Sequence, residues 1–314
     1  MLFLTEEDVK RLLPMKEAVR LMRTAFEALG AGDAINQPRR RLVLPTGSIL
    51  HQMAASWRGY FGTKIYSTHV KHGAHFIFIL YDAMTARPLA QFDANFLGQI
   101  RTGAASGLAT DLLAAPDAST VGLIGSGFQA WTQLEAMIAV RPIRSVKVFS
   151  RSPEKRNSFA EGAKESFGID VRAVNSAEEA VRDAEIILTV TYAKDPVFDA
   201  AWVRKGAHIN AAGANAPNRR EVPAEVFPRA RCIAVDSAEQ ARIEGGDLLL
   251  ARPAAEWSEW PLCELADLVS GKAKSAKSSG DLTIFKSLGL AVEDVAAAAY
   301  VYEQFQGELG WVKK

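Results

Sequence analysis

The chain has 314 residues, of which 48% are hydrophobic and 23% charged, as in an ordinary globular protein. A net charge of +1 argues against a basic protein that coats nucleic acid. No window approaches the roughly 18 unbroken apolar residues of a membrane span. The two cysteines, Cys232 and Cys263, argue against a disulfide framework, and residues 1–10 lack the basic start of a signal peptide. We therefore expect a cytoplasmic protein with no nucleic-acid or membrane partner.

The first third of the chain predicts a small α+β domain. Residues 5–30 predict one helix, because Thr5 precedes three acidic residues that favour the positive end of a helix dipole. Short β-rich segments separated by turn residues then predict an antiparallel sheet. A helix rich in small residues is expected at 99–114. The predicted strands are 41–45, 62–70, 75–81 and 88–93.

After Pro116 the pattern changes to a regular alternation of strands and helices, which predicts a doubly wound parallel sheet. Its strands are near-continuous apolar runs, as expected where both faces of a sheet are covered. Residues 271–281 are polar and predict an exposed loop, and a helix at 291–303 is expected to return to the first domain. Strands are predicted at 119–124, 145–149, 171–174, 185–190, 207–212 and 232–235, and helices at 128–140, 153–167 and 177–182.

Residues 125–130 read GSGFQA, a G-x-G-x-x-A motif between an apolar strand and a helix. Gly125 permits the tight turn, Gly127 lets the backbone approach a pyrophosphate, and Ala130 allows close helix–strand packing. The helix N-terminus offers free N–H groups to phosphates. The motif indicates a Rossmann dinucleotide site, the alternative being a glycine turn that binds nothing. Within it we assign Gly125, Gly127, Phe128 and Gln129 to the cofactor.

The end of the next strand distinguishes between the two nicotinamide cofactors. NAD enzymes usually place an acid there for the ribose hydroxyls, but this strand ends in Ser150, Arg151 and Ser152, with Arg156 just beyond. A basic, hydroxyl-rich pocket suits a 2′-phosphate, so NADP(H) is favoured over NAD(H). The alternative is that the arginines only form a solvated helix start.

Two later strand ends are also expected to face the cofactor. Thr191 follows one predicted strand and Ala212 ends another. Ligands of open α/β sheets bind outside the carboxyl ends of the strands, where both residues are expected to lie.

Seven segments, spread over nearly the whole chain and in a shared order, resemble the ornithine cyclodeaminase and mu-crystallin family. Each segment is modest, and their order makes the match specific. They are QPRR at 37–40, GTK at 62–64, RTGAA at 101–105, GSGFQA at 125–130, INAAGANAPNRRE at 209–221, EGGDL at 244–248 and FKSLG at 285–289.

The resemblance implies a subunit of two domains that forms a homodimer through its substrate domain. Residues 1–115 with 285–314 would form this substrate-binding and dimerisation domain, and 116–284 the Rossmann domain. The resemblance also implies chemistry at the α-carbon of a small amino or imino acid. Arg40, Lys64 and Arg101 would hold the substrate carboxylate, which agrees with the bidentate fit of guanidinium to carboxylate. We further assign Leu288 to the substrate, and Arg101 and Ser287 to the cofactor.

Asn215 is an informative departure, because the resemblance implies that cyclodeaminases carry a catalytic aspartate there. Asn215 cannot exchange a proton near neutral pH, although it can hydrogen-bond a substrate or a water. We therefore expect the reductase branch, in which NADPH reduces an α-imino acid and Lys64 and Asn215 are catalytic. The reverse direction would make the protein an amino acid dehydrogenase.

Three alternatives concern other chemistry. An NAD-dependent ornithine cyclodeaminase would form proline without net cofactor consumption, and a nicotinamide-binding protein would show no turnover. His69, His72 and His75 could indicate a metal cluster, but no cysteine or carboxylate set completes one, so no metal is expected.

Overall fold

The computed structural model describes residues 1–274 and 280–309, so part of the predicted loop at 271–281 lies outside the described residues. The chain divides into two compact units. Unit 1 comprises residues 1–101 and 289–314, and unit 2 comprises residues 102–288. The division into a substrate-binding domain (1–115 with 285–314) and a Rossmann domain (116–284) stays a prediction.

Unit 1 contains a mixed sheet in the order β1-β7-β6-β5-β4-β2, with β3 also paired to β4. Strand β1 runs parallel to β7, whereas the other pairs are antiparallel. The prediction of a wholly antiparallel sheet was therefore wrong at this edge, because β1 is a three-residue apolar strand with no alternation to reveal it. The strands are β1 (Leu2–Leu4), β2 (Ile35–Asn36), β3 (Arg40–Val43), β4 (Ile49–Trp57), β5 (Tyr60–His69), β6 (Gly73–Asp82) and β7 (Pro88–Asp93).

Two helices replace the single helix predicted at 5–30. They are α1 (Glu6–Leu12) and α2 (Met15–Ala31), and Pro14 separates them as the N-cap residue of α2. Proline lacks the N–H that a continuous helix would need at this position, so the first helix ends before it. Thr5 caps α1 in a reciprocal box with Asp8, which confirms the predicted helix start.

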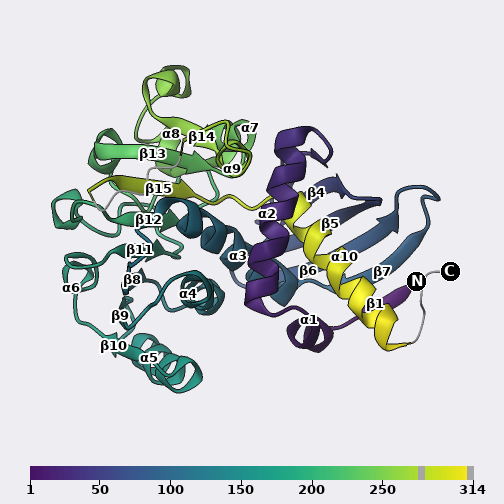
Figure 1. Cartoon of the computed structure of the whole chain (residues 1–314), viewed down its shortest axis with the longest axis horizontal. Helices are drawn as coiled ribbons and strands as arrows, with labels where there is room; N and C mark the ends of the chain where they lie inside the picture. Colours follow the sequence, from purple (N-terminus) through teal and green to yellow (C-terminus); the bar gives the residue numbers. More distant parts are fainter. Residues whose placement is uncertain (275–279, 310–314) are drawn as a thin grey trace. The chain divides into compact units, whose positions relative to one another are not determined.

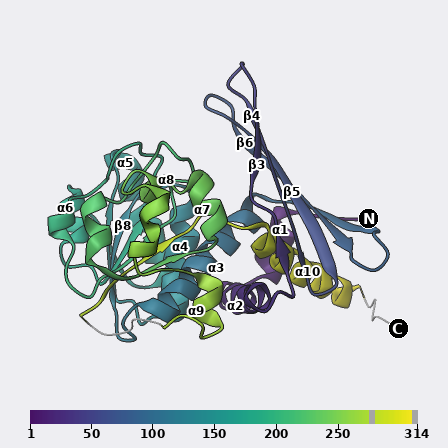
Figure 2. The ribbon, with the colours of Figure 1, turned by 90° about the horizontal axis from the view of Figure 1, so that it is seen from above.

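Helix α10 (Ala291–Glu308) lies along β4 and β5 and also packs against α2 (Figure 1). We call the sheet face toward α10 the inner face and the opposite face the outer face. Side chains of β4 and β5 alternate between these faces, and the inner set, which includes Met53 and Lys64, is buried. The strands and α10 can be followed from a second direction in Figure 2.

Unit 2 contains an eight-stranded sheet in the order β10-β9-β8-β11-β12-β15-β13-β14, and every pair is parallel. From β8 the chain winds outward to β9 and β10 and then returns to the other side at β11. This reversal is the topological switch point where doubly wound sheets bind ligands. The predicted fold class is confirmed, although β14 and β15 were not predicted. The strands are β8 (Thr120–Ile124), β9 (Ser145–Phe149), β10 (Asp170–Ala173), β11 (Ile186–Thr189), β12 (His208–Ala211), β13 (Ala230–Val235), β14 (Leu262–Glu264) and β15 (Leu282–Lys286).

Short helices connect these strands, and α3 precedes them. The longer helices α4 and α5 follow β8 and β9, where the sequence predicted them. The helices are α3 (Asn95–Leu113), which spans the division between the units, α4 (Phe128–Val140), α5 (Pro153–Phe167), α6 (Ala177–Val181), η1 (Ala200–Trp202), η2 (Ala224–Arg229), α7 (Ala238–Glu244), α8 (Gly246–Leu249), η3 (Ala254–Glu259) and α9 (Leu265–Val269).

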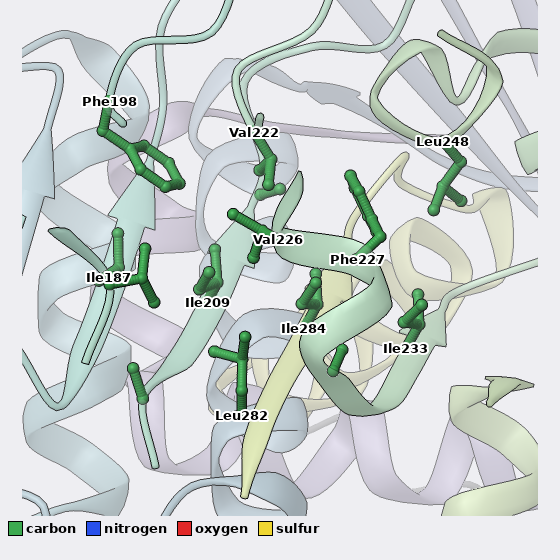
Figure 3. Close-up of a cluster of buried hydrophobic side chains, with 14 of the residues drawn as sticks. Ile187, Phe198, Ile209, Val222, Val226, Phe227, Ile233, Leu248, Leu282 and Ile284 are labelled. Atoms are coloured by element: carbon green, nitrogen blue, oxygen red, sulfur yellow. The ribbon is translucent and has the colours of Figure 1, made fainter. Parts of the chain in front are cut away.

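A row of isoleucines joins four neighbouring strands of unit 2. Ile187, Ile209, Ile284 and Ile233 are paired in register from β11 to β13, and none is exposed. Phe227 and its neighbours pack over this row (Figure 3). β-Branched side chains fit a pleated surface that is covered in this way. The dry core holds the strands in register and so fixes the positions of their carboxyl ends.

Candidate functional site

The carboxyl ends of β9, β8, β11, β12 and β15 lie side by side along one edge of the unit 2 sheet, because these strands are adjacent and parallel. The predicted cofactor residues of unit 2 all follow one of these ends. They are Gly125, Gly127, Phe128 and Gln129 after β8, Ser150, Arg151, Ser152 and Arg156 after β9, Thr191 after β11, Ala212 after β12, and Ser287 after β15.

The turn between β8 and α4 needs its two glycines for different reasons. Gly125 has a φ of 112°, and a Cβ there would lie 2.6 Å from the carbonyl oxygen of Val190. Gly127 caps α4 with an ordinary φ of −91°, and a Cβ there would meet no protein atom within 4 Å. No internal contact demands glycine at 127, whereas an open space before a helix N-terminus suits a phosphate. These residues therefore fit a dinucleotide.

The end of β9 carries no carboxylate at Ser150, Arg151 or Ser152 and is joined to the glycine turn. The hydroxyl of Ser126 donates to that of Ser150 at 2.8 Å. The Arg156 guanidinium donates to the Ser150 carbonyl oxygen and to Asn175, both at 3.0 Å, so it braces the backbone. Arg151 is exposed. Of the two arginines after β9, Arg151 is therefore the one whose side chain is exposed to solvent.

Ser287 and Leu288 are buried after β15, with side chains 3% and 4% exposed. The backbone N–H of Ser287 donates to Ala211, and that of Leu288 donates to the Asp236 carboxylate at 2.6 Å. Asn215, in contrast, is exposed in the loop after β12. Of the predicted residues after β12 and β15, Asn215 is therefore the most accessible side chain.

Lys64 lies on the inner face of the unit 1 sheet and is 2% exposed. Its Nζ donates to the Asp294 carboxylate of α10 at 2.9 Å. Burial lowers the pKa of Lys64 to about 8, the carboxylate of Asp294 opposes this shift, and the nearby Arg101 adds to it. Lys64 can therefore gain or lose a proton close to neutral pH.

Arg101 lies beside Lys64 and is held by two carboxylates of α10. Its Nη1 donates to Glu293 at 2.8 Å and its Nε donates to Asp294 at 3.2 Å. Burial acts to lower the pKa of Arg101, but the charges of Asp294 and Glu293 outweigh it and raise that pKa. Arg101 thus stays a fixed positive charge.

Two glycines make room for these cations. A Cβ on Gly98 of α3 would lie 2.5 Å from the Lys64 Nζ. Gly289 has a φ of +78°, and a Cβ there would lie 2.4 Å from the Arg101 Nη1. Glycine at both positions lets the cations pack against the backbone.

The structure does not bring Arg40 to this cluster. Arg40 pairs with Gln52, whereas Lys64 pairs with Met53, so the two side chains lie on opposite faces of the sheet. Arg40 is exposed, and its neighbour Arg39 is buried at 6% exposure. Arg39 donates to the Gly289 carbonyl oxygen at 3.2 Å, and its charge lowers the pKa of Lys64.

The buried cluster in unit 1, comprising Arg39, Lys64, Arg101, Glu293 and Asp294, has three cationic groups and two carboxylates. Both carboxylates are fully buried. A surplus cation in a buried setting is costly unless an anion joins it. The arrangement therefore favours binding of one further carboxylate.

Sequence reasoning missed Arg39, Gly98, Glu293 and Asp294. A signal existed for the last two, because they are the acidic pair in an otherwise apolar helix start, AVEDVAAAAY at 291–300. An acid in a helix whose neighbours are all apolar has to be buried with a partner. Arg39 could not be separated from Arg40 without the strand register.

The three histidines lie at the end of β5, in the turn after it and in β6. The rings of His69 and His72 lie 4.6 Å apart, and His75 is exposed. Within residues 1–274 and 280–309, no three or more histidine, cysteine or acidic side chains are placed to hold a metal ion. None of the helices in this described part has the length and apolar character needed to cross a bilayer.

Comparison with known proteins identifies the family to which this chain belongs. The profile of the ornithine cyclodeaminase/mu-crystallin family matches residues 1–308. The chain belongs to this family. The resemblance predicted from the seven sequence segments is therefore confirmed.

Members of the ornithine cyclodeaminase/mu-crystallin family with known roles resemble the chain over nearly its full length. Delta(1)-pyrroline-2-carboxylate reductase from Bacillus cereus is 34% identical over 315 residues, 97% of this chain and 96% of the reductase. The Thermococcus litoralis reductase of the same name, solved with NADH and L-proline, has a TM-score of 0.93 at 32% identity, covering 99% and 98% of the two chains. An archaeal alanine dehydrogenase dimer with bound NAD has a TM-score of 0.92 at 33% identity, covering 98% and 97%.

Proposed function

We propose that the chain is an NAD(P)H-dependent oxidoreductase that reduces the C=N bond of a small α-imino acid, or oxidises the corresponding amino acid in reverse. The observation that carries the proposal is the buried cluster around Lys64, whose surplus positive charge suits the carboxylate of such a substrate. The open glycine turn after β8 supports the nicotinamide requirement. The reductase and dehydrogenase relatives support the reaction class.

In the proposed mechanism, Arg101 and Arg39 hold the substrate carboxylate, with Arg39 taking the role first expected for Arg40. Lys64 Nζ completes the clamp as an ammonium ion and can give its proton to the substrate, since its pKa lies near 8. Asn215 orients the imine nitrogen or a water by hydrogen bonding. A bound nicotinamide would supply the hydride, held by the residues after β8, β9, β11, β12 and β15.

We further propose that NADP(H) is favoured over NAD(H). The support is the absence of a carboxylate at residues 150–152 and the exposed Arg151. The relatives solved with NADH and NAD make this a point for direct measurement. Replacing Arg151 with alanine should raise the Kd of NADPH about tenfold and leave the Kd of NADH nearly unchanged. Cofactor fluorescence would measure both constants.

The deciding experiment follows NADPH absorbance with purified protein and a panel of cyclic ketimines, and of α-keto acids with ammonium. Ornithine with NAD is run in parallel. We expect NADPH to be consumed with at least one imino acid and more slowly with NADH. If no imine consumes either cofactor, but ornithine yields proline and ammonia, the reductase proposal is wrong and the cyclodeaminase alternative replaces it.

We also propose that the protein forms a homodimer through the outer face of the unit 1 sheet. Leu42 and Ile77 lie on this face and are 59% and 44% exposed, so apolar surface is available for a second copy. The archaeal alanine dehydrogenase, solved as a dimer, supports a dimeric state, and the choice of this face rests on its exposed apolar side chains. Light scattering after gel filtration should give a dimer, and Ile77→Asp should give a monomer; a wild-type monomer would contradict the proposal.

A reducing compartment, and with it the cytoplasm, is our proposal for the protein's location. Cys232 and Cys263 lie with their Sγ atoms 3.7 Å apart as free thiols. Thiols at this distance remain reduced where glutathione and thioredoxin maintain them. A fusion to a fluorescent protein would test the compartment directly.

A further inference from the structure

Glu221, six residues after Asn215, joins the carboxyl ends of two neighbouring strands. Its side chain is fully buried and accepts hydrogen bonds from the Thr189 hydroxyl at 3.2 Å and the Thr191 N–H at 2.5 Å, both at the end of β11. It also accepts from the N–H groups of Gly213 and Ala214, at 2.8 and 3.1 Å, after β12. One carboxylate thus fixes both strand ends.

Lys286 of β15 holds the same loop from the next strand. Its Nζ donates to the carbonyl oxygens of Ala211 and Ala214. It also pairs with Asp247 at 2.9 Å, and Lys286 and Asp247 are both fully buried. The loop after β12 is therefore tied to β11 through Glu221 and to β15 through Lys286.

Asp247 completes the network by holding Glu221 itself. The other oxygen of Asp247 accepts from the backbone N–H groups of Glu221 and Val222, at 2.6 and 2.9 Å. The Val222 side chain is anchored in the core below (Figure 3). Because the backbone of Glu221 is fixed in this way, its carboxylate stays in place and holds the loop after β12 in one position.

Tight packing leaves this loop little freedom. A Cβ on Gly213 would lie 2.4 Å from the backbone of Thr191 and 2.5 Å from the Glu221 carboxylate. The segments fixed here carry Thr191, Ala212 and Asn215, which we assigned to the cofactor and substrate. Glu221 has no exposed surface, so it acts on any ligand through these neighbours.

We propose that Glu221 is a positioning residue that, with Asp247 and Lys286, holds Thr191 and residues 212–215 in the arrangement that receives the nicotinamide. The inference rests on the proposed function, and it assigns a role to three residues that do not touch the ligand. Misplacement of a binding group by about 1 Å can cost about 100-fold in rate, so buried supports of this kind have measurable effects.

Glu185 provides a matched control at the opposite, amino-terminal edge of the same sheet. Its carboxylate accepts hydrogen bonds from the N–H and hydroxyl groups of both Ser119 and Thr120, at the start of β8. It therefore ties strand starts together by hydrogen bonds as Glu221 ties strand ends, although its side chain is 26% exposed and also pairs with Arg204, and it lies far from the strand ends that bind ligands. Comparing the two carboxylates separates positioning from general stabilisation.

The experiment measures thermal stability, the Kd of NADPH by fluorescence, and kcat and KM for Glu221→Gln and Glu185→Gln. An amide cannot accept every N–H that the carboxylate accepts, so both variants should lose stability. We expect Glu221→Gln alone to raise the Kd of NADPH about 10-fold or more and to lower kcat, with Glu185→Gln within about twofold of wild type. A purely structural role would leave the Kd of the folded fraction unchanged in both.

A milder pair keeps the test decisive if Glu221→Gln does not fold. Thr189→Val removes one donor to Glu221, and Thr120→Val removes the equivalent hydroxyl donor to Glu185. Thr189→Val should raise the Kd about two- to threefold and Thr120→Val should not. Equal Kd values in all folded variants would overturn the positioning role alone, whereas a wild-type protein that binds neither NADPH nor NADH would overturn the proposed function with it.

Discussion

The two units each bury a cluster of charged side chains, and the clusters have opposite balances. In unit 1, the cations Arg39, Lys64 and Arg101 outnumber the carboxylates Glu293 and Asp294. In unit 2, the carboxylates Glu221 and Asp247 outnumber the single cation Lys286. Both sets are almost inaccessible to water.

The difference lies in what completes each cluster. The excess negative charge of unit 2 is met by backbone N–H groups after β11 and β12 and by those of Glu221 and Val222, so the protein itself supplies the donors of that network. In unit 1, Lys64 and Arg101 pair with the two carboxylates and Arg39 donates to the Gly289 carbonyl oxygen, and an α-imino acid would supply a third carboxylate. A buried charge network completed by backbone is a support, whereas one with a surplus of one sign is suited to binding a counterion.

The largest expected effect comes from removing the surplus cation of unit 1. Lys64→Met should lower kcat/KM about 1000-fold, because the substrate carboxylate loses a buried charged partner, an effect of about 4 kcal/mol. Stability should change little, since Arg101 still pairs with Asp294. Steady-state kinetics and thermal melts check both parts, and a Lys64→Met protein with wild-type kinetics would remove Lys64 from the mechanism.

The complementary change in unit 2 should act on stability. Lys286→Met leaves Glu221 and Asp247 buried together without a cation, which should cost about 3–5 kcal/mol in the free energy of unfolding. The control is Lys147→Met, which removes an exposed ion pair with Asp183 and should cost less than about 1 kcal/mol. Denaturant unfolding measures both, and similar small losses would show that the two carboxylates need no cation.

The sequence predicted most of unit 2 because each strand and helix there carries a local signal, such as the apolar run at 120–124 followed by a glycine turn. Strand β4 was missed although Met53, Ala55 and Trp57 alternate on its buried face. The charged clusters could not be derived, because the partners Lys64 and Asp294 are 230 residues apart. Only the pairing register of β3, β4 and β5 shows that Arg40 lies on the opposite face of the sheet from Lys64.

The pH dependence of catalysis tests whether the surplus charge of unit 1 is Lys64 itself. With a pKa of about 8, the Lys64 ammonium is largely protonated below pH 8 and loses its proton as the pH rises through that value. Because only the ammonium attracts a carboxylate, kcat/KM should fall up to about tenfold per pH unit above pH 8. Lys64→Arg keeps its charge and should remove this descent, whatever its absolute rate. A wild-type profile that stays level to pH 10 would contradict the assignment.

The smallest change concerns the space that Gly98 leaves for Lys64. Gly98→Ala would place a methyl group 2.5 Å from the present position of Lys64 Nζ, so the flexible ammonium end has to move aside. Helix α3 gains about 1 kcal/mol of propensity from alanine, so stability should hold or rise. The KM for the imino acid should nevertheless rise about 5- to 10-fold, as expected for a displaced charged contact. Gly307→Ala near the end of α10 is the control, because it is the same substitution in a helix and a Cβ there meets open space. If Gly98→Ala and Gly307→Ala have the same KM for the imino acid, the exact position of Lys64 is unimportant and the cluster binds carboxylate through its net charge alone.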